Sequence, residues 1–350
     1  MNPLLSIIVI SHEQCEELKR CLDSILAMKM PFAYEIIVSD DRSTDGTREM
    51  LKEYSNERVS ELTNGQGKLV VTYCNSDEGN CANNSQRSGY NRCNAYPLAK
   101  GKYIAHVDAD DYFRDGADVY VRQVEALEQH LECSLAMSSV LWLDVDCEEK
   151  DAKQWNRVHS YHDGDVFSSS DYIENNLFII NQAFIQRRNP EVNPVDLYGN
   201  RYVDSVITFH HMQFGKIVYV EACDYVYVQH RQSVTGNMAQ CGRDLDILWC
   251  MPIYIGALIP CFWHDYIKSE VGYWSVRRVV DMAIEGYNLA EKNRNSLSDL
   301  SIWIYRCFLD EVGVRDKVRL RVIRALMKVM KKCSLFNYKV TNILKIMLFV

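Results

Sequence analysis

Two clusters of aspartates carry the strongest chemical signal in the sequence. Asp40-Asp41 directly follows the predicted strand 35–39, and Asp108-Ala109-Asp110-Asp111 directly follows the predicted strand 102–107. Adjacent carboxylates raise one another's pKa unless they share a cation. Because no cysteine or histidine cluster accompanies them, their oxygens suit a hard ion such as Mg2+ or Mn2+. An ion with so few protein ligands completes its shell with phosphate oxygens, which indicates a nucleotide diphosphate.

Either cluster alone is explained equally well by an ordinary turn or a helix cap, since aspartate is common in both. Two clusters at two predicted strand ends favour a site. No G-x-G-x-x-G follows the first apolar run, where SHEQC stands, and no G-x-x-x-x-G-K-[ST] occurs. The dehydrogenase and P-loop interpretations are therefore disfavoured. The net charge of -8 also argues against nucleic acid as a partner.

Alternating strands and helices in the first 110 residues must position these acids. The β-branched and helical periodicities predict strands at 5–10, 35–39, 69–73 and 102–107, and helices at 16–28, 47–54 and 86–99. Ser43, Thr44 or Asp45 is expected to cap the helix at 47–54. This order is typical of an α/β fold, in which ligands bind at the carboxyl ends of the strands.

The rest of the chain is predicted to complete this domain and add a helical region. We expect a helix at 119–131, a strand at 134–143, a helix at 203–214, and strands at 216–220 and 224–229. After Gly236 only long helical segments follow, so we expect a catalytic domain at 1–236 and a helical region at 237–350.

Two further features favour a cytoplasmic protein. The opening segment MNPLLSIIVISHE has no basic leader and meets an acid after a short apolar run, so we expect a buried strand rather than a signal peptide or a membrane span. The number of cysteines, 13, is odd and none are spaced as Cys-x-x-Cys, which favours reduced thiols without a structural zinc site.

Three sequence blocks, SIIVISHE, EIIVSDDRSTDGT and GKYIAHVDADDYF, closely resemble in order and spacing the opening of the family 2 inverting glycosyltransferases with the GT-A fold. Further on, YVDSVITFHHMQFGKIVYV resembles the segment that carries the catalytic acid of this family. DYVYVQHRQSVTG resembles the strand and loop that close its donor site. The resemblance covers residues 4–236. It implies a GT-A fold with a mixed, mainly parallel central sheet flanked by helices, and a C-terminal helical extension.

The resemblance also implies roles for individual residues. Asp41 matches the carboxylate that reads the donor base, and Asp108 and Asp110 match the D-x-D motif whose last member reaches the metal. Asp204 matches the catalytic base. Ser11, His12 and Glu13 stand where the family has residues near the base and ribose.

This sequence departs from the family pattern at three places. The usual Arg-Asn before the third helix is Arg92-Cys93, so Arg87 is kept beside Arg92 as a candidate donor contact. Val203 replaces an acid before Asp204. His230 stands where some members contact the metal or a phosphate, although a lone histidine at a strand end is more often a packed residue.

The implied reaction moves a sugar from a nucleotide-sugar, with UDP the expected nucleotide, to a hydroxyl of a glycan or lipid-linked glycan. Mn2+ or Mg2+ is the expected cofactor, and the anomeric configuration is expected to invert. Two alternatives stay open. One is a catalytically silent carbohydrate-binding subunit of a polysaccharide assembly complex, and the other is a sugar-1-phosphate nucleotidyltransferase, which would need a Gly- and Arg-rich loop where SHEQCEE stands.

The predicted helical region ends in a basic tail. Between residues 315 and 345 ten basic residues face the single acid Asp316. A helical wheel separates an apolar stripe from a basic one, a pattern typical of an interfacial helix on an anionic membrane. A helix that packs on the catalytic domain explains the pattern equally well. The protein is therefore expected in the cytoplasm, with peripheral contact at the inner membrane face as one possibility.

Overall fold

The structure is a computed structural model that describes residues 2–78, 84–155, 161–168, 183–189, 211 and 214–229. The chain divides into two compact units, Met1–Asn237 and Met238–Val350, and every described residue lies in the first. The predicted boundary at 236 and 237, the helical region at 237–350 and its basic tail lie outside the described residues. The predicted helix at 203–214 also lies outside them, except for His211 and Phe214.

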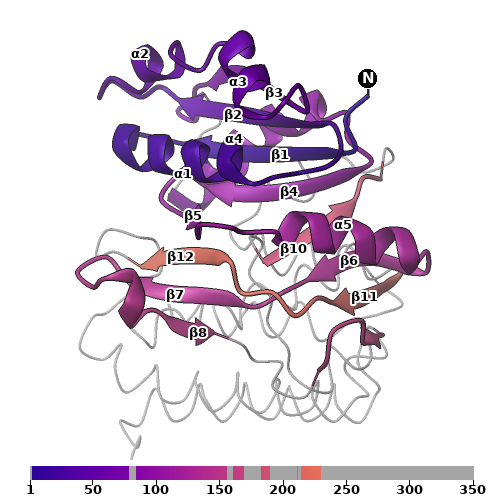
Figure 1. Cartoon of the computed structure of the whole chain (residues 1–350). Helices are drawn as coiled ribbons and strands as arrows, with labels where there is room; N and C mark the ends of the chain where they lie inside the picture. The colour runs from indigo at the N-terminus through magenta and orange to yellow at the C-terminus, as the bar shows by residue number, and fades with distance from the viewer. Residues whose placement is uncertain are drawn as a thin grey trace, which may run out of the picture. The chain divides into compact units, whose positions relative to one another are not determined.

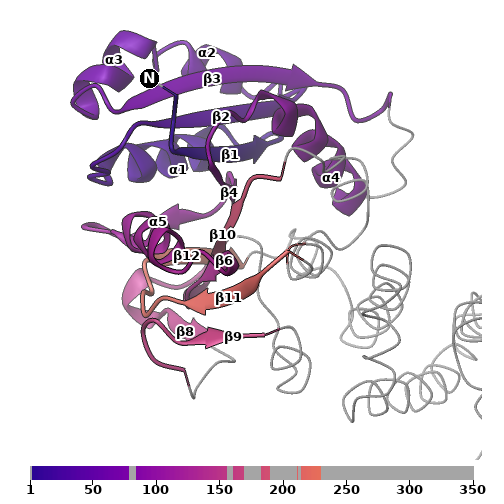
Figure 2. The same cartoon turned by 90° about the vertical axis from the view of Figure 1, so that its right-hand side faces the viewer.

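An eight-stranded mixed sheet forms the centre of the first unit, with the strand order β3-β2-β1-β4-β10-β6-β11-β9 (Figures 1 and 2). The neighbours among the first four strands are parallel, whereas β10 is antiparallel to β4 and β6. The predicted α/β class with a mixed, mainly parallel sheet is confirmed. The strands are β1 (Leu5–Ser11), β2 (Tyr34–Asp41), β3 (Gly67–Cys74), β4 (Tyr103–Asp108), β6 (Cys133–Met137), β9 (Val166–Phe167), β10 (Phe184–Arg187) and β11 (Lys216–Tyr219).

The apolar runs of the first half form strands because helices cover both faces of the sheet. Every residue of β1 and β2 is buried, as expected for strands in the middle of a parallel sheet. Helix α1 (Cys15–Ala27) buries an apolar stripe that includes Leu18, Leu22 and Ile25. Helix α4 (Asn84–Ala95) lies on the opposite face of the sheet (Figures 1 and 2).

The shorter helices differ from the sequence prediction in their ends. Gly46, with φ of 97°, is the N-cap of α2 (Thr47–Leu51). The side chain of Asp45, the residue before Gly46, accepts the Thr47 N–H at 3.1 Å. The predicted cap is therefore wrong in position, because a left-handed residue precedes the helix and glycine adopts that conformation without strain. A separate helix, α3 (Asn56–Leu62), follows and was not predicted.

The third predicted helix also ends early. A 3₁₀ turn with a proline at its start, Tyr96–Leu98, follows α4, and α5 (Val119–Gln129) comes next. Proline cannot donate the backbone hydrogen bond that would continue an α-helix, which explains the early end. Among the helices of the described residues, none combines the length and apolarity needed to cross a membrane.

The single strand predicted at 134–143 is wrong, because the chain changes sheet in the middle of this segment. Strand β6 ends at Met137, and β7 (Val140–Asp144) belongs to a second sheet. Between them, the Ser138 N–H donates to the Ala183 carbonyl and the Ser139 N–H donates to the Ala222 carbonyl. The two serines therefore bond to different segments, and the strand divides there.

The second sheet has four strands in the order β5-β12-β7-β8, in which β12 is parallel to β7. Its strands are β5 (Tyr112–Phe113), β7, β8 (Lys153–Trp155) and β12 (Tyr225–Gln229), and a 3₁₀ turn, Glu149–Asp151, precedes β8. Leu143, Val226 and Val228 form an apolar cluster on this sheet.

Asp111 ties the end of β4 to the second sheet. Its carboxylate is buried, and it accepts the Tyr225 hydroxyl at 2.5 Å and the Val228 N–H at 2.8 Å. Burial, and then the charges of Asp110 and Asp108, raise the pKa of Asp111 well above its usual value. Burying Asp111 beside Asp108 and Asp110 is therefore electrostatically unfavourable. Its two hydrogen bonds to β12 offset this cost, which indicates a structural role for Asp111.

We predict that Asp111→Ala lowers the free energy of unfolding by about 2–4 kcal/mol, because the Tyr225 hydroxyl and the Val228 N–H lose their buried acceptor. Urea denaturation followed by tryptophan fluorescence measures the change. Asp115→Ala, at an exposed aspartate four residues later, is the matched control and is expected to stay within about 0.5 kcal/mol of the parent. Equal stability of the two variants would contradict a structural role for Asp111.

Candidate functional site

The carboxyl ends of four parallel strands bring the candidate residues to one edge of the sheet. In the strand register, Ser11 at the end of β1 lies opposite Asp40 of β2, and Ile10 lies opposite Asp108 at the end of β4. Neighbouring strands are about 4.8 Å apart. Asp41 and Asp108, which are 67 positions apart in the sequence, therefore end strands separated only by β1.

Asp41 is a buried carboxylate that accepts hydrogen bonds from the neighbouring residue and from the segment after β3. Its Oδ1 accepts the Ser76 backbone N–H at 2.9 Å and the Arg42 Nε–H at 3.3 Å. Burial raises the pKa of Asp41, but the hydrogen bonds from Ser76 and Arg42 outweigh burial and lower it below the ordinary value. Asp41 is therefore an ionised hydrogen-bond acceptor at neutral pH.

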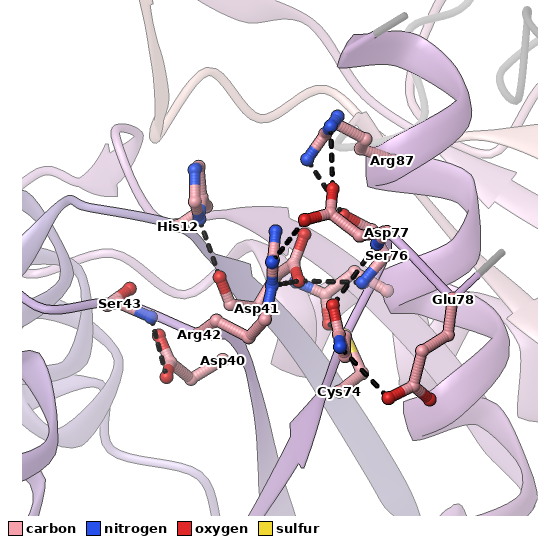
Figure 3. A network of polar contacts seen from close by, with 12 residues as sticks. His12, Asp40, Asp41, Arg42, Ser43, Cys74, Ser76, Asp77, Glu78 and Arg87 are labelled. Atoms are coloured by element: carbon pink, nitrogen blue, oxygen red, sulfur yellow. Dashed lines mark hydrogen bonds and ion pairs between the residues drawn. The ribbon is translucent and has the colours of Figure 1, made fainter. Parts of the chain in front are cut away.

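Arg42, Asp77 and Arg87 extend this contact across the surface of the edge (Figure 3). Arg42 Nη1 donates to Asp77 Oδ2 at 2.5 Å, and Arg87 Nη2 contacts Asp77 Oδ1 at 2.8 Å. Arg87 Nη1 also donates to the Ser76 hydroxyl at 3.2 Å. The predicted candidate Arg87 thus lies in the same network as Asp41.

The sequence analysis missed Arg42, Ser76 and Asp77. Arg42 lies beside the predicted Asp41, but no motif singles out the segment that carries Ser76 and Asp77. Its closeness to Asp41 follows from the pairing of β2 with β3, in which Asp41 lies opposite Cys74.

The end of β1 places its three candidates differently. Among the described residues, the buried Ser11 hydroxyl has no hydrogen-bond partner. His12 lies with Nδ1 2.6 Å from the Asp41 carbonyl. Glu13 is exposed, and its Oε1 accepts both the backbone N–H and the hydroxyl of Thr44. The Glu13 carboxylate therefore holds the turn after β2.

Arg92 supplies a positive charge inside the second acidic cluster. Its side chain is only 4% exposed, and Nη2 contacts Asp108 Oδ1 at 2.5 Å. Nη1 donates to the Ser88 hydroxyl. The sequence predicted that these acids need a nearby positive charge. At Asp108 the buried Arg92 supplies that charge. Arg92 is placed to hold Asp108.

Helix α1 fixes the backbone of the D-x-D turn. Arg20 Nη2 donates to the Asp110 carbonyl at 2.9 Å, and the Phe113 N–H donates to the Ser24 hydroxyl at 3.1 Å. The Cys21 thiol lies 3.9 Å from the Asp108 carbonyl. These α1 residues were also missed, because about 90 positions separate them from the turn and no local pattern marks them.

The chemistry of this cluster fits a hard divalent cation that takes most of its ligands from a substrate. Asp110 is partly exposed at the edge and offers carboxylate oxygens. Within the part of the chain that the structure describes, no group of three histidine, cysteine or acidic side chains lies close enough together to hold a metal.

Asp204 and His230, predicted as the catalytic base and as a metal contact, lie outside the described residues. His211, in the segment after Asp204, is among the described residues. His211 is buried, and its carbonyl accepts the Ser134 hydroxyl at 2.7 Å. Residue 211 is thus held beside the start of β6.

Comparison with known families and proteins gave several matches. The model described as "Glycosyl transferase family 2" matches residues 6–134. An uncharacterised protein of Mycobacterium tuberculosis (strain ATCC 25618 / H37Rv) is 26% identical over 235 residues, which cover 66% of this chain and 60% of that protein. The poly(ribitol-phosphate) beta-glucosyltransferase of Bacillus spizizenii is 33% identical over 123 residues, which cover 34% of this chain and 16% of the relative. This chain thus spans less than two thirds of either relative.

A solved structure matches more of the chain. S. aureus TarS 1-349 in complex with UDP-GlcNAc has a TM-score of 0.54 and 15% identity, and the match covers 92% of this chain and 87% of that one. At this identity the similarity concerns the fold alone. It confirms the predicted GT-A fold class. The segments 202–220 and 224–236, on which the predicted base and closing loop depend, lie outside the residues that the family model matches.

We predict that His106 makes the fold sensitive to acid. This β4 residue is fully buried, and burial, followed by the charges of Arg92 and His211, lowers its pKa well below 6.5. The unfolded chain takes up a proton at this position below about pH 6.5, whereas the folded chain does not. Stability should therefore fall by about 1.4 kcal/mol for each pH unit below that value.

Chemical denaturation between pH 7.5 and 5 tests this dependence. In His106→Gln the slope of unfolding free energy against pH should decrease by the amount that one proton contributes, because the titrating group is gone. His162→Gln, at an exposed histidine, is the control and should keep the parental slope. An unchanged slope in His106→Gln would show that His106 is protonated in the folded protein.

Proposed function

We propose that this chain, whose residues 6–134 match the model of glycosyl transferase family 2, transfers a sugar from a nucleotide-sugar, with UDP as the nucleotide, to a hydroxyl of a glycan or lipid-linked glycan. The proposed reaction inverts the anomeric configuration. The observation that carries this proposal is the buried, ionised Asp41 at the same sheet edge as the Asp108–Arg92 pair. In this proposal Asp41 accepts a hydrogen bond from the base of the nucleotide, and the diphosphate lies at the turn that carries Asp108 and Asp110.

The binding of UDP-GlcNAc by TarS, which has the same fold, supports a UDP-sugar as the donor. The relative named for poly(ribitol-phosphate) supports a polymer hydroxyl as the acceptor. We place the reaction in the cytoplasm. Contact of the basic tail at 315–345 with an anionic membrane stays a prediction.

Each candidate residue has a separate role in the proposed reaction. Asp41 orients the base, and Arg92 holds the Asp108 carboxylate while Arg20 holds the backbone of the turn at Asp110. Asp110, with His230 as a second candidate, would hold Mn2+ or Mg2+, which when bound supplies positive charge for the departing diphosphate. Asp204 takes the proton from the acceptor hydroxyl as general base.

We predict that UDP raises the melting temperature of the protein and that Mn2+ increases this rise. Ligand at a hundred times its dissociation constant adds about 2.7 kcal/mol to the free energy of unfolding. Asp110→Asn should lose the part that depends on Mn2+, whereas Asp115→Asn, the exposed control, should keep it. Thermal shift with UDP, GDP and dTDP, each with and without Mn2+, gives the measurement. A shift in the parent that is indifferent to Mn2+ would contradict the metal assignment.

We predict that Asp204→Asn lowers transfer by about 100-fold or more, because loss of a general base typically costs that much while donor binding is kept. Radiolabelled transfer from UDP-sugars and calorimetric UDP titration separate the two effects. If the variant keeps more than about a tenth of the parental rate, Asp196 or Glu191 becomes the candidate base. A parent that binds UDP but neither transfers nor hydrolyses any donor would favour the silent carbohydrate-binding subunit.

A further inference from the structure

Arg42 has a backbone conformation that its side chain does not favour. Its φ is +56°, and the other described non-glycine residues with positive φ are Glu13 and Asn64. Asparagine tolerates this left-handed region, whereas for a long side chain it carries a steric cost. Such a cost is kept only where the surroundings impose the conformation, which often marks a functional position.

The contacts of Arg42 close a ring of five residues (Figure 3). Arg42 bonds to the carboxylates of Asp41 and Asp77, and Arg87 bonds to Asp77 and to the Ser76 hydroxyl. The Ser76 N–H then returns to Asp41 Oδ1. The ring joins the end of β2, the segment after β3 and helix α4, and its two arginines balance its two aspartates in charge.

The ring restrains the carboxylate of Asp41. Two donors approach Oδ1 from different segments of the chain, so the plane of the carboxylate is held. A ligand that meets this carboxylate must offer a hydrogen-bond donor, because the carboxylate is ionised and accepts only.

We propose that Arg42, which is itself held by Asp77, is a positioning residue that orients Asp41, so that the site selects a nucleobase with an N–H at the edge facing Asp41. This inference rests on the proposed function. Uracil offers such an N–H at N3. N3 of cytosine is a hydrogen-bond acceptor, so it would repel the Asp41 carboxylate, which also only accepts. A buried acceptor left unpaired in this way is costly, so a restrained Asp41 discriminates more strongly than a mobile one.

Arg42→Gly is the sharpest test, because glycine adopts positive φ without strain while the whole side chain is lost. The variant is therefore expected to stay folded. Calorimetric titration with UDP and with CDP compares two ligands that share the ribose and the diphosphate. We expect UDP affinity to fall about tenfold, the scale for a lost charge-assisted hydrogen bond, and CDP affinity to change less than about twofold.

Two further variants complete the design. Asn64→Gly places glycine at another residue with positive φ, away from the edge, and should leave both affinities unchanged. Asp77→Asn keeps the shape of the bridging side chain but removes its charge, so it should reduce the preference for UDP over CDP in the same direction as Arg42→Gly.

Each outcome decides a separate point. Equal losses for UDP and CDP in Arg42→Gly would mean that Arg42 binds the diphosphate directly, and unchanged affinities would mean that it has no role; both overturn the inference. A parent that binds UDP no more tightly than CDP also overturns it and leaves the proposed transferase function standing. A parent that binds no nucleotide diphosphate, with or without Mn2+, contradicts the proposed function itself.

Discussion

Carboxylates gathered at one edge of a parallel sheet repel one another, and each must be given its own partner. The structure meets this constraint in three ways. Asp41 receives a backbone N–H and an arginine from neighbouring segments, and Asp108 receives the buried guanidinium of Arg92. Asp111 receives a tyrosine hydroxyl and a backbone N–H of β12. These partners come from the segment after β3, from helix α4 and from strand β12, so the carboxylates connect these segments to the edge of the sheet.

The partner of Asp111 also determines how the two sheets are joined. Because this acid lies at the end of the turn after β4 and its donors lie on β12, the second sheet is held directly beside the D-x-D turn. Aromatic contacts add to the connection, since Phe113 packs edge to face against Tyr225 with ring centroids 5.1 Å apart. Asp111, which directly follows the D-x-D motif, thus acts as a structural link between the sheets.

The first sheet is completed by a similar long-range contact. Arg187, on the antiparallel strand β10, donates to the Leu127, His130 and Cys133 carbonyls. Backbone carbonyls at the end of a helix lack intrahelical partners, so an arginine from another strand satisfies them. This contact anchors β10 against the end of α5.

Local patterns in the sequence determined the parallel first half of the fold, the strand ends that carry Asp41 and Asp108, and the resemblance to glycosyl transferase family 2, because apolar runs and short motifs are local properties of the chain. The strand β10, the division at Ser138 and Ser139 and the position of Gly46 were not predictable from such patterns. Neither was the ring through Arg42, Ser76, Asp77 and Arg87. These features depend on which distant segment offers a hydrogen-bond partner, and that is decided only when the strands pair and the edge of the sheet is assembled.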